Sequence, residues 1–369
     1  MAFFREGIVR HVVEEMPDLV RAEVELDTGE SCAADAFPPM IGRLEAGHRV
    51  VVNTTGLDLG LGTGGRGFVL WDLDAPPPAP SGGGHIVKMR YTPWQTEVLA
   101  VEEEASEHYE ALVDAESIGG MPVVACGLHS HVPAVAAGVR AERPDAGIGY
   151  LMTDGAGLPL AWSDLVRASK GVGLLDVTAT CGHAFGGDLE TINVFSGLVA
   201  LRHAARADVA IVAMGPGVVG TGSALGFTAI EQGQVLDAAT ALGGRAVACL
   251  RISFADERPR HHGISHHTLT ALRLAAREPA DVVVPQLPAT EELLAQLGDA
   301  GRRHRVHVVD PAPGMELLRA TGLRLSSMRR SIDEVPETFA AAAAAGTHAG
   351  RLLEGPPRRA AGNGSDTLG

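Results

Sequence analysis

The sequence is poor in lysine and in aromatic residues, which are only 4% of the chain. Lys88 and Lys170 are its only lysines, so a reaction that needs a catalytic lysine has two candidates. Acidic residues outnumber basic ones, and the net charge of the 369 residues is -15. Because contacts with nucleic acids and anionic lipids need clustered basic residues, we expect neither nucleic acid nor a membrane as a partner.

Cysteine is scarce, and long apolar runs are missing. The four cysteines form no CxxC pair, which is typical of a protein from a reducing compartment. No uncharged apolar run reaches about 18 residues, and charges interrupt the first segment, MAFFREGIVRHVVEE. We therefore expect neither a membrane-spanning helix nor a signal peptide, and a cytoplasmic location.

The first part of the chain has the pattern of a small β-barrel. Short runs in which β-branched residues alternate with others are separated by turn signals. The segment DAPPPAPSGGG follows them and is predicted to be a linker, because its prolines and glycines cannot continue a helix or a central strand. We expect a scaffolding or dimerising role for this barrel, and with it a homo-oligomer. The predicted strands are 7–13, 20–26, 49–53 and 67–70, and the predicted domains are 1–84 (barrel and linker), 85–353 (α/β) and 354–369 (disordered tail).

From about residue 120, short apolar runs alternate with helix-period segments. This alternation predicts a Rossmann-like, doubly wound and mostly parallel sheet with helices on both faces. A TIM-like β/α barrel is the alternative, because residues 97–101 could supply an eighth unit. The predicted strands are 122–125, 148–152, 173–177, 209–214, 246–252, 282–284 and 306–309; the main predicted helices are 133–141, 160–169, 189–205, 224–241, 267–277 and 290–297.

Polar and ionisable residues gather after the predicted strands, whereas the helix-to-strand turns are short and plain. Because the carboxyl ends of parallel strands border the binding crevice, we expect the ligand site there. The richest of these loops read GLHSH (127–131), TATCGHAFGGD (178–188), GPGVVGTGS (215–223) and SFADERPRHHGISHH (253–267).

The glycine loop, residues 215–223, contains G-x-G-x-x-G directly after an apolar strand. Such glycines let backbone N–H groups approach an anion at a helix start. The interpretation as a dinucleotide-binding fingerprint is weakened, because no acidic residue ends a strand about 20 residues later. A P-loop is excluded, because no lysine follows these glycines. A tight, ligand-free loop is the alternative. The predicted anion-binding residues of this loop are Gly215, Gly217, Gly220, Thr221, Gly222 and Ser223.

The cationic loop, residues 253–267, concentrates arginine and histidine in an acidic chain. Arg258 and Arg260 can bind a phosphate or carboxylate through paired N–H groups, and His266 can transfer protons near neutral pH. Ser265 is a good N-cap for a helix that follows it. The alternative is an exposed basic loop without a ligand.

Histidines after other strands allow a metal site. His129 and His131 are spaced as H-x-H, and His183 with Asp154 or Asp310 could complete a set of nitrogen and oxygen ligands if the strands are neighbours. A buried imidazole bonded to a neighbouring loop is the alternative for His129 and His131.

The stretches GLHSHVPA, TDGAGLP, GHAFGGDLE, MGPGVVGTGS and RISFADERPRHHGISHHT resemble the signature segments of domain-of-unknown-function family 3866. This resemblance covers nearly the whole chain and implies a bacterial protein, of the kind met in actinobacteria and clostridia. It implies no reaction, cofactor or catalytic residue.

The sequence thus predicts an enzyme acting on a small anionic, phosphorylated or nucleotide-like metabolite. Its candidate proton-transfer residues are His129, His131, His183 and His266, and no cofactor is identified. One alternative is a metal-dependent hydrolase that uses His129, His131 and His183. Another is a non-catalytic metabolite-sensing or assembly protein. We expect the glycine loop to meet either GLHSH or the cationic loop in one site.

Overall fold

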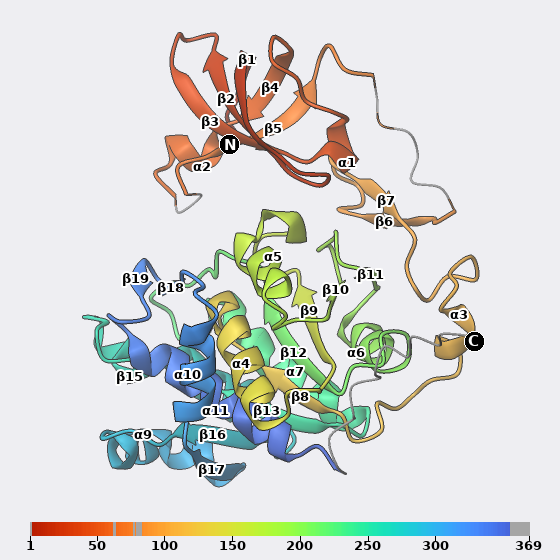
Figure 1. The fold of residues 1–369 in the computed structure, drawn as a ribbon. Coiled ribbons are helices and arrows are strands. Elements are labelled where there is room, and N and C mark those ends of the chain that lie inside the picture. Colours follow the sequence, from red (N-terminus) through yellow and green to blue (C-terminus); the bar gives the residue numbers. More distant parts are fainter. Residues whose placement is uncertain (1, 62–63, 77, 79–82, 355–369) are drawn as a thin grey trace, which may run out of the picture.

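The computed structural model describes residues 2–61, 64–76, 78 and 83–354. A small β-barrel stands above a larger α/β sheet in Figure 1, where the barrel is coloured red to orange. Most of the predicted tail, residues 354–369, and part of the predicted linker lie outside the described residues.

The barrel closes because its strands alternate between apolar and polar residues. In β2 the residues Val20, Ala22 and Val24 are buried, whereas Glu23 and Glu25 between them are exposed. Neighbouring strands pair in the order β1-β2-β3-β5-β4, and β4 pairs with β1 to close the barrel, as predicted. The strands are β1 (Phe4–Glu15), β2 (Val20–Leu26), β3 (Ser31–Ala36), β4 (Arg49–Asn53) and β5 (Gly67–Asp72).

The second part contains one eight-stranded sheet, all of it parallel. Its order is β11-β10-β9-β12-β8-β13-β16-β17, which confirms a Rossmann-like, doubly wound fold. The strands are β8 (Pro122–Ala125), β9 (Ile148–Thr153), β10 (Val177–Thr180), β11 (Leu189–Glu190), β12 (Val209–Met214), β13 (Arg245–Cys249), β16 (Asp281–Pro285) and β17 (Arg305–Val309).

Helices cover both faces because the strands are apolar on both sides. Val123 of β8 belongs to one hydrophobic cluster and its neighbour Val124 to the other. One face is covered by α4 (Val132–Glu142), α5 (Asp164–Gly171) and α11 (Pro336–Arg351), against which α10 (Ala312–Ala320) packs; the other is covered by α6 (Val194–His203), α7 (Glu231–Ala241), α8 (His266–Thr270) and α9 (Thr290–Arg302).

Short elements connect these layers. They are α1 (Pro38–Ile41), α2 (Thr55–Asp58), α3 (Tyr109–Leu112), the hairpin β6 (Ile86–Lys88) with β7 (Thr96–Val98), β14 (Ile252–Ser253) with β15 (Gly263–Ile264), and β18 (Ser326–Ser327) with β19 (Arg330–Ser331). Turns of 3-10 helix lie at His129–His131, Leu160–Trp162, Thr228–Ile230 and Pro259–His261, and a π-turn at Ala271–Ala275.

The TIM-like alternative is wrong, because the sheet is open and its strand order reverses in the middle. Residues 97–101 do not supply the extra parallel strand, since β7 pairs antiparallel with β6 and Ala100 makes only an isolated parallel bridge to Glu190 of β11. The eighth strand is β11, and its two residues lie at the start of the predicted helix 189–205. In the structure this helix is α6, which begins only after the capping residue Asn193. The strand predicted at 173–177 begins at Val177, after Gly173 with its positive φ.

The strand order places the crevice at the middle of the sheet. The chain leaves β8 toward β9 on one side, and it leaves β12 toward β13 on the other. Loops that leave neighbouring strands in opposite directions open a crevice at their carboxyl ends. The glycine loop and the cationic loop follow β12 and β13, which flank β8 in this region.

The barrel contacts the α/β part through polar bonds. Trp162 donates its Nε1–H to Asp35 Oδ2 at 2.9 Å, and Arg21 of β2 pairs with Asp164 at 2.7 Å. The domain boundaries 1–84 and 85–353 stay a prediction. Among the described residues, no helix is both long and apolar enough to cross a membrane.

Candidate anion site

The glycine loop and the cationic loop meet at the carboxyl end of the sheet. Together they line a cavity of about 100 Å³, which exceeds the volume of about 30 Å³ that one water occupies and suits a compact oxyanion. Met328, from the turn between β18 and β19, closes one side. The cavity is lined by Val218, Gly220, Thr221, Arg251, Arg258, Arg260, His261, His267 and Met328.

Arg251 is the buried cation of this cavity. It comes two residues after the end of β13, next to the apolar residues Leu250 and Ile252, and is only 6% exposed. Among the described residues, no carboxylate lies within 4.0 Å of its side chain. Burial lowers the pKa of Arg251 to about 10, so its guanidinium still carries a charge at neutral pH. Asp256, which Arg258 already holds, attracts this charge through space but does not form an ion pair with it. A buried charge without a direct ion pair is costly, and a bound anion would lower that cost.

His267 is fixed by Arg251 as a hydrogen-bond donor. Arg251 Nη1 lies 3.2 Å from His267 Nδ1, and because guanidinium groups only donate, Nδ1 must accept. Burial, and then the charge of Arg251, lower the pKa of His267 to about 3, so the ring is neutral and carries its proton on Nε2. This Nε2 is buried and has no hydrogen-bond partner among the described atoms. The structure therefore presents an unused N–H group beside the unpaired guanidinium.

The glycine loop approaches His267 closely at Gly220. A Cβ at this position would lie 2.9 Å from His267 Cε1 and 3.2 Å from Nε2. The His267 ring stacks on Phe227, with ring centroids 4.1 Å apart and an interplanar angle of 3°. The absence of a side chain at Gly220 thus leaves room for the His267 imidazole at the cavity wall.

Arg258 and Arg260 lie at the open side of the cavity, and both are exposed. Arg258 already holds Asp256 through two bonds of 2.9 and 2.7 Å, and this pairing keeps the pKa of Asp256 well below its usual range. Arg260 has no hydrogen bond or ion pair with any described residue. Arg260 is therefore the surface cation that is free to contact a ligand.

His261 and His266 complete a cluster of three imidazoles with His267. The ring centroids lie 4.5 to 5.0 Å apart, and one ligand nitrogen of each ring lies within 4.8 Å of the others. Burial, then neighbouring arginine charges, lower the pKa of His261 to about 4 and also lower the pKa of His266. Three neutral imidazoles could hold a metal, but Nε2 of His267 carries a proton in this arrangement, and arginine charges surround the cluster.

The remaining glycine-loop residues have other roles. Gly217 has a φ of +99° and lines a separate apolar cleft, and a side chain on Gly215 would strike the backbone of Gly157. Ser223 bonds within the loop, where Thr221 Oγ1 lies 2.9 Å from its Oγ, and Gly222 faces open space. The loop does not lead directly into a helix, because α7 begins only at Glu231. Of the predicted anion-binding residues, Gly220, Thr221, Arg258 and Arg260 line the cavity.

His129 is bonded at both nitrogens. Its Nε2 lies 2.6 Å from Ser163 Oγ, and its Nδ1 lies 3.1 Å from the Tyr150 hydroxyl. Burial lowers the pKa of His129 to about 4. His129 thus has the position expected from the alternative to a metal ligand, a buried imidazole that is bonded to a neighbouring loop.

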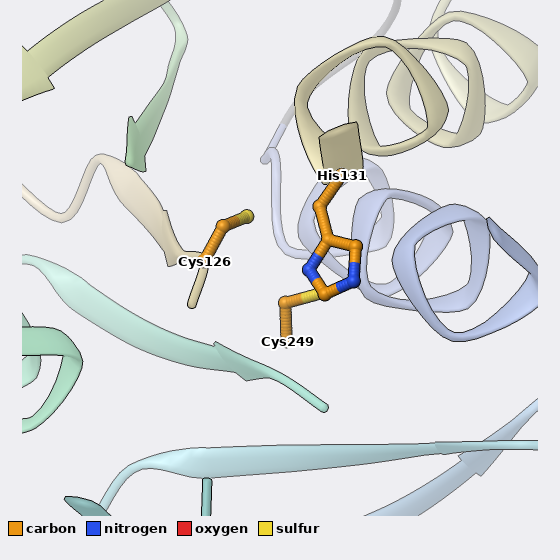
Figure 2. A group of neighbouring side chains, drawn as sticks. All are labelled: Cys126, His131 and Cys249. Carbon is orange, nitrogen blue, oxygen red and sulfur yellow. The ribbon is translucent and has the colours of Figure 1, made fainter. Parts of the chain in front are cut away.

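His131 lies in the core beside two cysteines, Cys126 and Cys249, as Figure 2 shows. Its Nδ1 is 3.3 Å from Cys249 Sγ, and Cys126 follows the neighbouring strand β8. Burial lowers the pKa of His131 to about 3 and raises that of Cys249 well above its usual value, so a neutral thiol and a neutral imidazole make this contact. These three residues offer two sulfurs and one nitrogen within 4.8 Å, a donor set that sequence spacing did not reveal.

The contact between His183 and Asp154 joins a backbone N–H to a carboxylate, and the His183 imidazole takes no part in it. The His183 N–H donates to Asp154 Oδ2 at 2.8 Å, and His183 Nδ1 accepts from the Met89 N–H at 3.0 Å. Asp310 follows β17 at the sheet edge, where it accepts from the Ala312 N–H. In the described part of the chain, the structure does not gather His129, His131, Asp154 and His183 into one ligand group.

The most important residue that the sequence analysis missed is Arg251. It lies inside the apolar run predicted as strand 246–252, and a charged residue at the end of such a run is the signal that could have identified it. His261 and His267 belonged to the cationic loop, but the sequence alone could not rank them above His266.

Comparison with family models gives one match, which spans residues 33–346 and has the description "Protein of unknown function (DUF3866)". The match covers most of the chain, including both loops of the cavity. The chain belongs to this family. The DUF3866 description assigns no reaction and no ligand. No curated protein and no solved structure matches the chain.

Proposed function

We propose that this DUF3866 protein binds the anionic group of a small metabolite in the cavity between the glycine loop and the cationic loop. The observation that carries the proposal is the buried Arg251 guanidinium, which has no carboxylate partner and lies beside the unused Nε2–H of His267. Arg260 adds a free charge at the entrance. The charged residues that line the cavity are arginines, and no carboxylate is among its described lining residues. Such a lining suits a phosphate, sulfate or carboxylate group.

We propose further that the protein acts on this metabolite as an enzyme, with His266 as the proton-transfer group. His266 does not line the cavity itself, but its ring centroid lies 4.5 Å from that of His267, which does. Its Nε2 has no partner among the described residues, and its lowered pKa keeps the imidazole in the base form at neutral pH. Binding of an anion nearby favours the imidazolium and makes the ring a stronger base. The non-catalytic sensor remains the alternative, and a His266→Gln variant separates the two once a substrate is found. Loss of turnover with affinity retained supports the enzyme; loss of affinity alone supports the sensor.

Thermal shift and calorimetry with sulfate, phosphate and acetate test the binding proposal, with chloride at the same ionic strength as the reference. We expect sulfate or phosphate to raise the melting temperature in a saturable manner. Arg260→Gln should weaken this binding about tenfold, because a charge-assisted hydrogen bond is lost. The matched control is Arg273→Gln, which removes another exposed arginine outside the cavity. Equal affinities of both variants, or no saturable binding of any oxyanion, would overturn the proposal.

A metal-dependent reaction at the three imidazoles is the second candidate, because their nitrogens lie within 4.8 Å of one another. Zinc, manganese or iron that copurifies in stoichiometric amount, and is lost in His267→Gln, would favour it over the anion site.

A further inference from the structure

A second, larger cavity lies beside the anion site. It is an apolar cleft of about 680 Å³ between the barrel and the α/β sheet. The barrel contributes residues such as Phe37, Phe68 and Leu61, and the sheet loops contribute Trp162 and Phe185, among others. The cleft is large enough for the body of an ordinary small-molecule ligand.

The cleft collects aromatic side chains from a chain that has few of them. Of the nine phenylalanines and three tryptophans in the sequence, Phe37, Phe68, Phe185, Trp94 and Trp162 line this cleft. No charged residue lies among its described lining residues, and Asn53 is the only polar amide there. Such a lining binds an uncharged, apolar group.

Apolar side chains are left exposed at the cleft. Leu61 and Val219 both line it, and each is 58% exposed to solvent. An apolar ligand would cover them and gain their hydrophobic contact.

One loop forms a wall of both cavities. Pro216, Gly217, Val218 and Val219 line the apolar cleft, and the next residues of the loop line the anion cavity. Val218 contributes to both, so the two spaces adjoin at this residue.

We propose that the ligand of this protein is amphipathic, with an anionic group in the Arg251 cavity and an uncharged apolar body in the cleft under the barrel. This inference rests on the proposed function and specifies its substrate class. It also assigns a role to the barrel, which supplies one wall of the site for the apolar body.

The experiment compares inorganic phosphate, hexyl phosphate, decyl phosphate and 1-naphthyl phosphate by calorimetry, below the concentrations at which the alkyl esters form micelles. We expect decyl phosphate to bind at least tenfold more tightly than hexyl phosphate, because each buried methylene strengthens binding about three- to fourfold. The naphthyl ester shows whether a planar or an extended body fits better.

Two variants locate the apolar body. Leu61→Asn should remove part of the gain in affinity from hexyl to decyl phosphate and leave the affinity for inorganic phosphate unchanged. Leu59→Asn is its control, because Leu59 is 57% exposed in the same loop but does not line the cleft. Arg260→Gln should weaken every ester and inorganic phosphate by the same factor.

The outcomes separate the two proposals. Binding of phosphate that depends on Arg260 but does not strengthen with the apolar body overturns the amphipathic ligand and leaves the anion site intact. Binding of the esters that is indifferent to Arg260→Gln, without binding of phosphate, overturns the anion site. Equal effects of Leu61→Asn and Leu59→Asn also contradict the placement of the body in the cleft.

Discussion

At the scale of single residues, the site depends on which nitrogen of His267 carries the proton. The bond from Arg251 makes Nδ1 an acceptor and leaves Nε2–H as a buried donor without a partner among the described atoms. Protonation of the ring, or a metal bound to Nε2, would each disturb this arrangement. Under the proposed function, this one interaction makes the cavity suited to an anion rather than to a cation.

The lowered histidine pKa values predict that the protein loses stability in mild acid. His131 and His267 have pKa values of about 3, and His129 and His261 of about 4, whereas histidine in an unfolded chain titrates near 6.5. Between these values the unfolded state binds protons that the folded state does not, so the free energy of unfolding falls as the pH drops from 6.5 toward 4. Glu231, whose pKa burial raises to about 7, works in the opposite direction but is a single group.

Urea unfolding at pH 7 and pH 5 measures this effect. We expect a lower unfolding midpoint at pH 5, and we expect sulfate to restore part of the loss because an anion favours the protonated form of His261. A midpoint that rises between pH 7 and pH 5 would contradict the burial of these histidines.

At the scale of elements, the glycine loop is shaped by close approach rather than by a helix start. Gly220 and Gly222 allow a direct comparison within it. Gly220→Ala places a Cβ 2.9 Å from His267 Cε1, and the ring cannot move freely because it stacks on Phe227. Gly222→Ala meets nothing within 4 Å. We expect Gly220→Ala to weaken sulfate binding severalfold, and Gly222→Ala to leave it unchanged, as measured by calorimetry. Equal affinities of the two variants would show that His267 does not contribute to the site.

The elements themselves were largely predictable from the sequence, because buried parallel strands are continuous apolar runs. Strands β8 and β12 have the predicted bounds. Strand β11 is too short to show any periodicity, and it lies inside the range predicted as helix 189–205. The site was predictable only as two loops. Arg258 and Arg260 could be recognised as a cationic island. For Arg251 the sequence offers one signal, a charge near the end of an apolar run, and its role depends on burial beside a neighbouring loop.

At the scale of the whole molecule, the barrel and the sheet are joined at Trp162. Its Nε1–H donates to the buried Asp35, which also accepts from Arg66. Trp162→Phe keeps most of the ring but removes this bond, and we expect the free energy of unfolding to fall by about 1–3 kcal/mol. The control is Trp71→Phe, since Trp71 is 56% exposed on the outside of the barrel. Urea titration should show a clear loss for the first variant only; an equal loss in both would mean that the bond to Asp35 does not stabilise the fold.

The proposed function requires an oxyanion to lie between Arg251 and His267. The most direct measurement is a crystal structure of the protein grown with selenate, with anomalous data collected at the selenium edge. We predict a selenium peak in the cavity, with selenate oxygens within hydrogen-bond distance of the Arg251 guanidinium and of His267 Nε2. Crystals that contain ordered selenate elsewhere but none in this cavity would contradict the placement of the oxyanion between Arg251 and His267. A metal ion bound to Nε2 of His267 would contradict it as well.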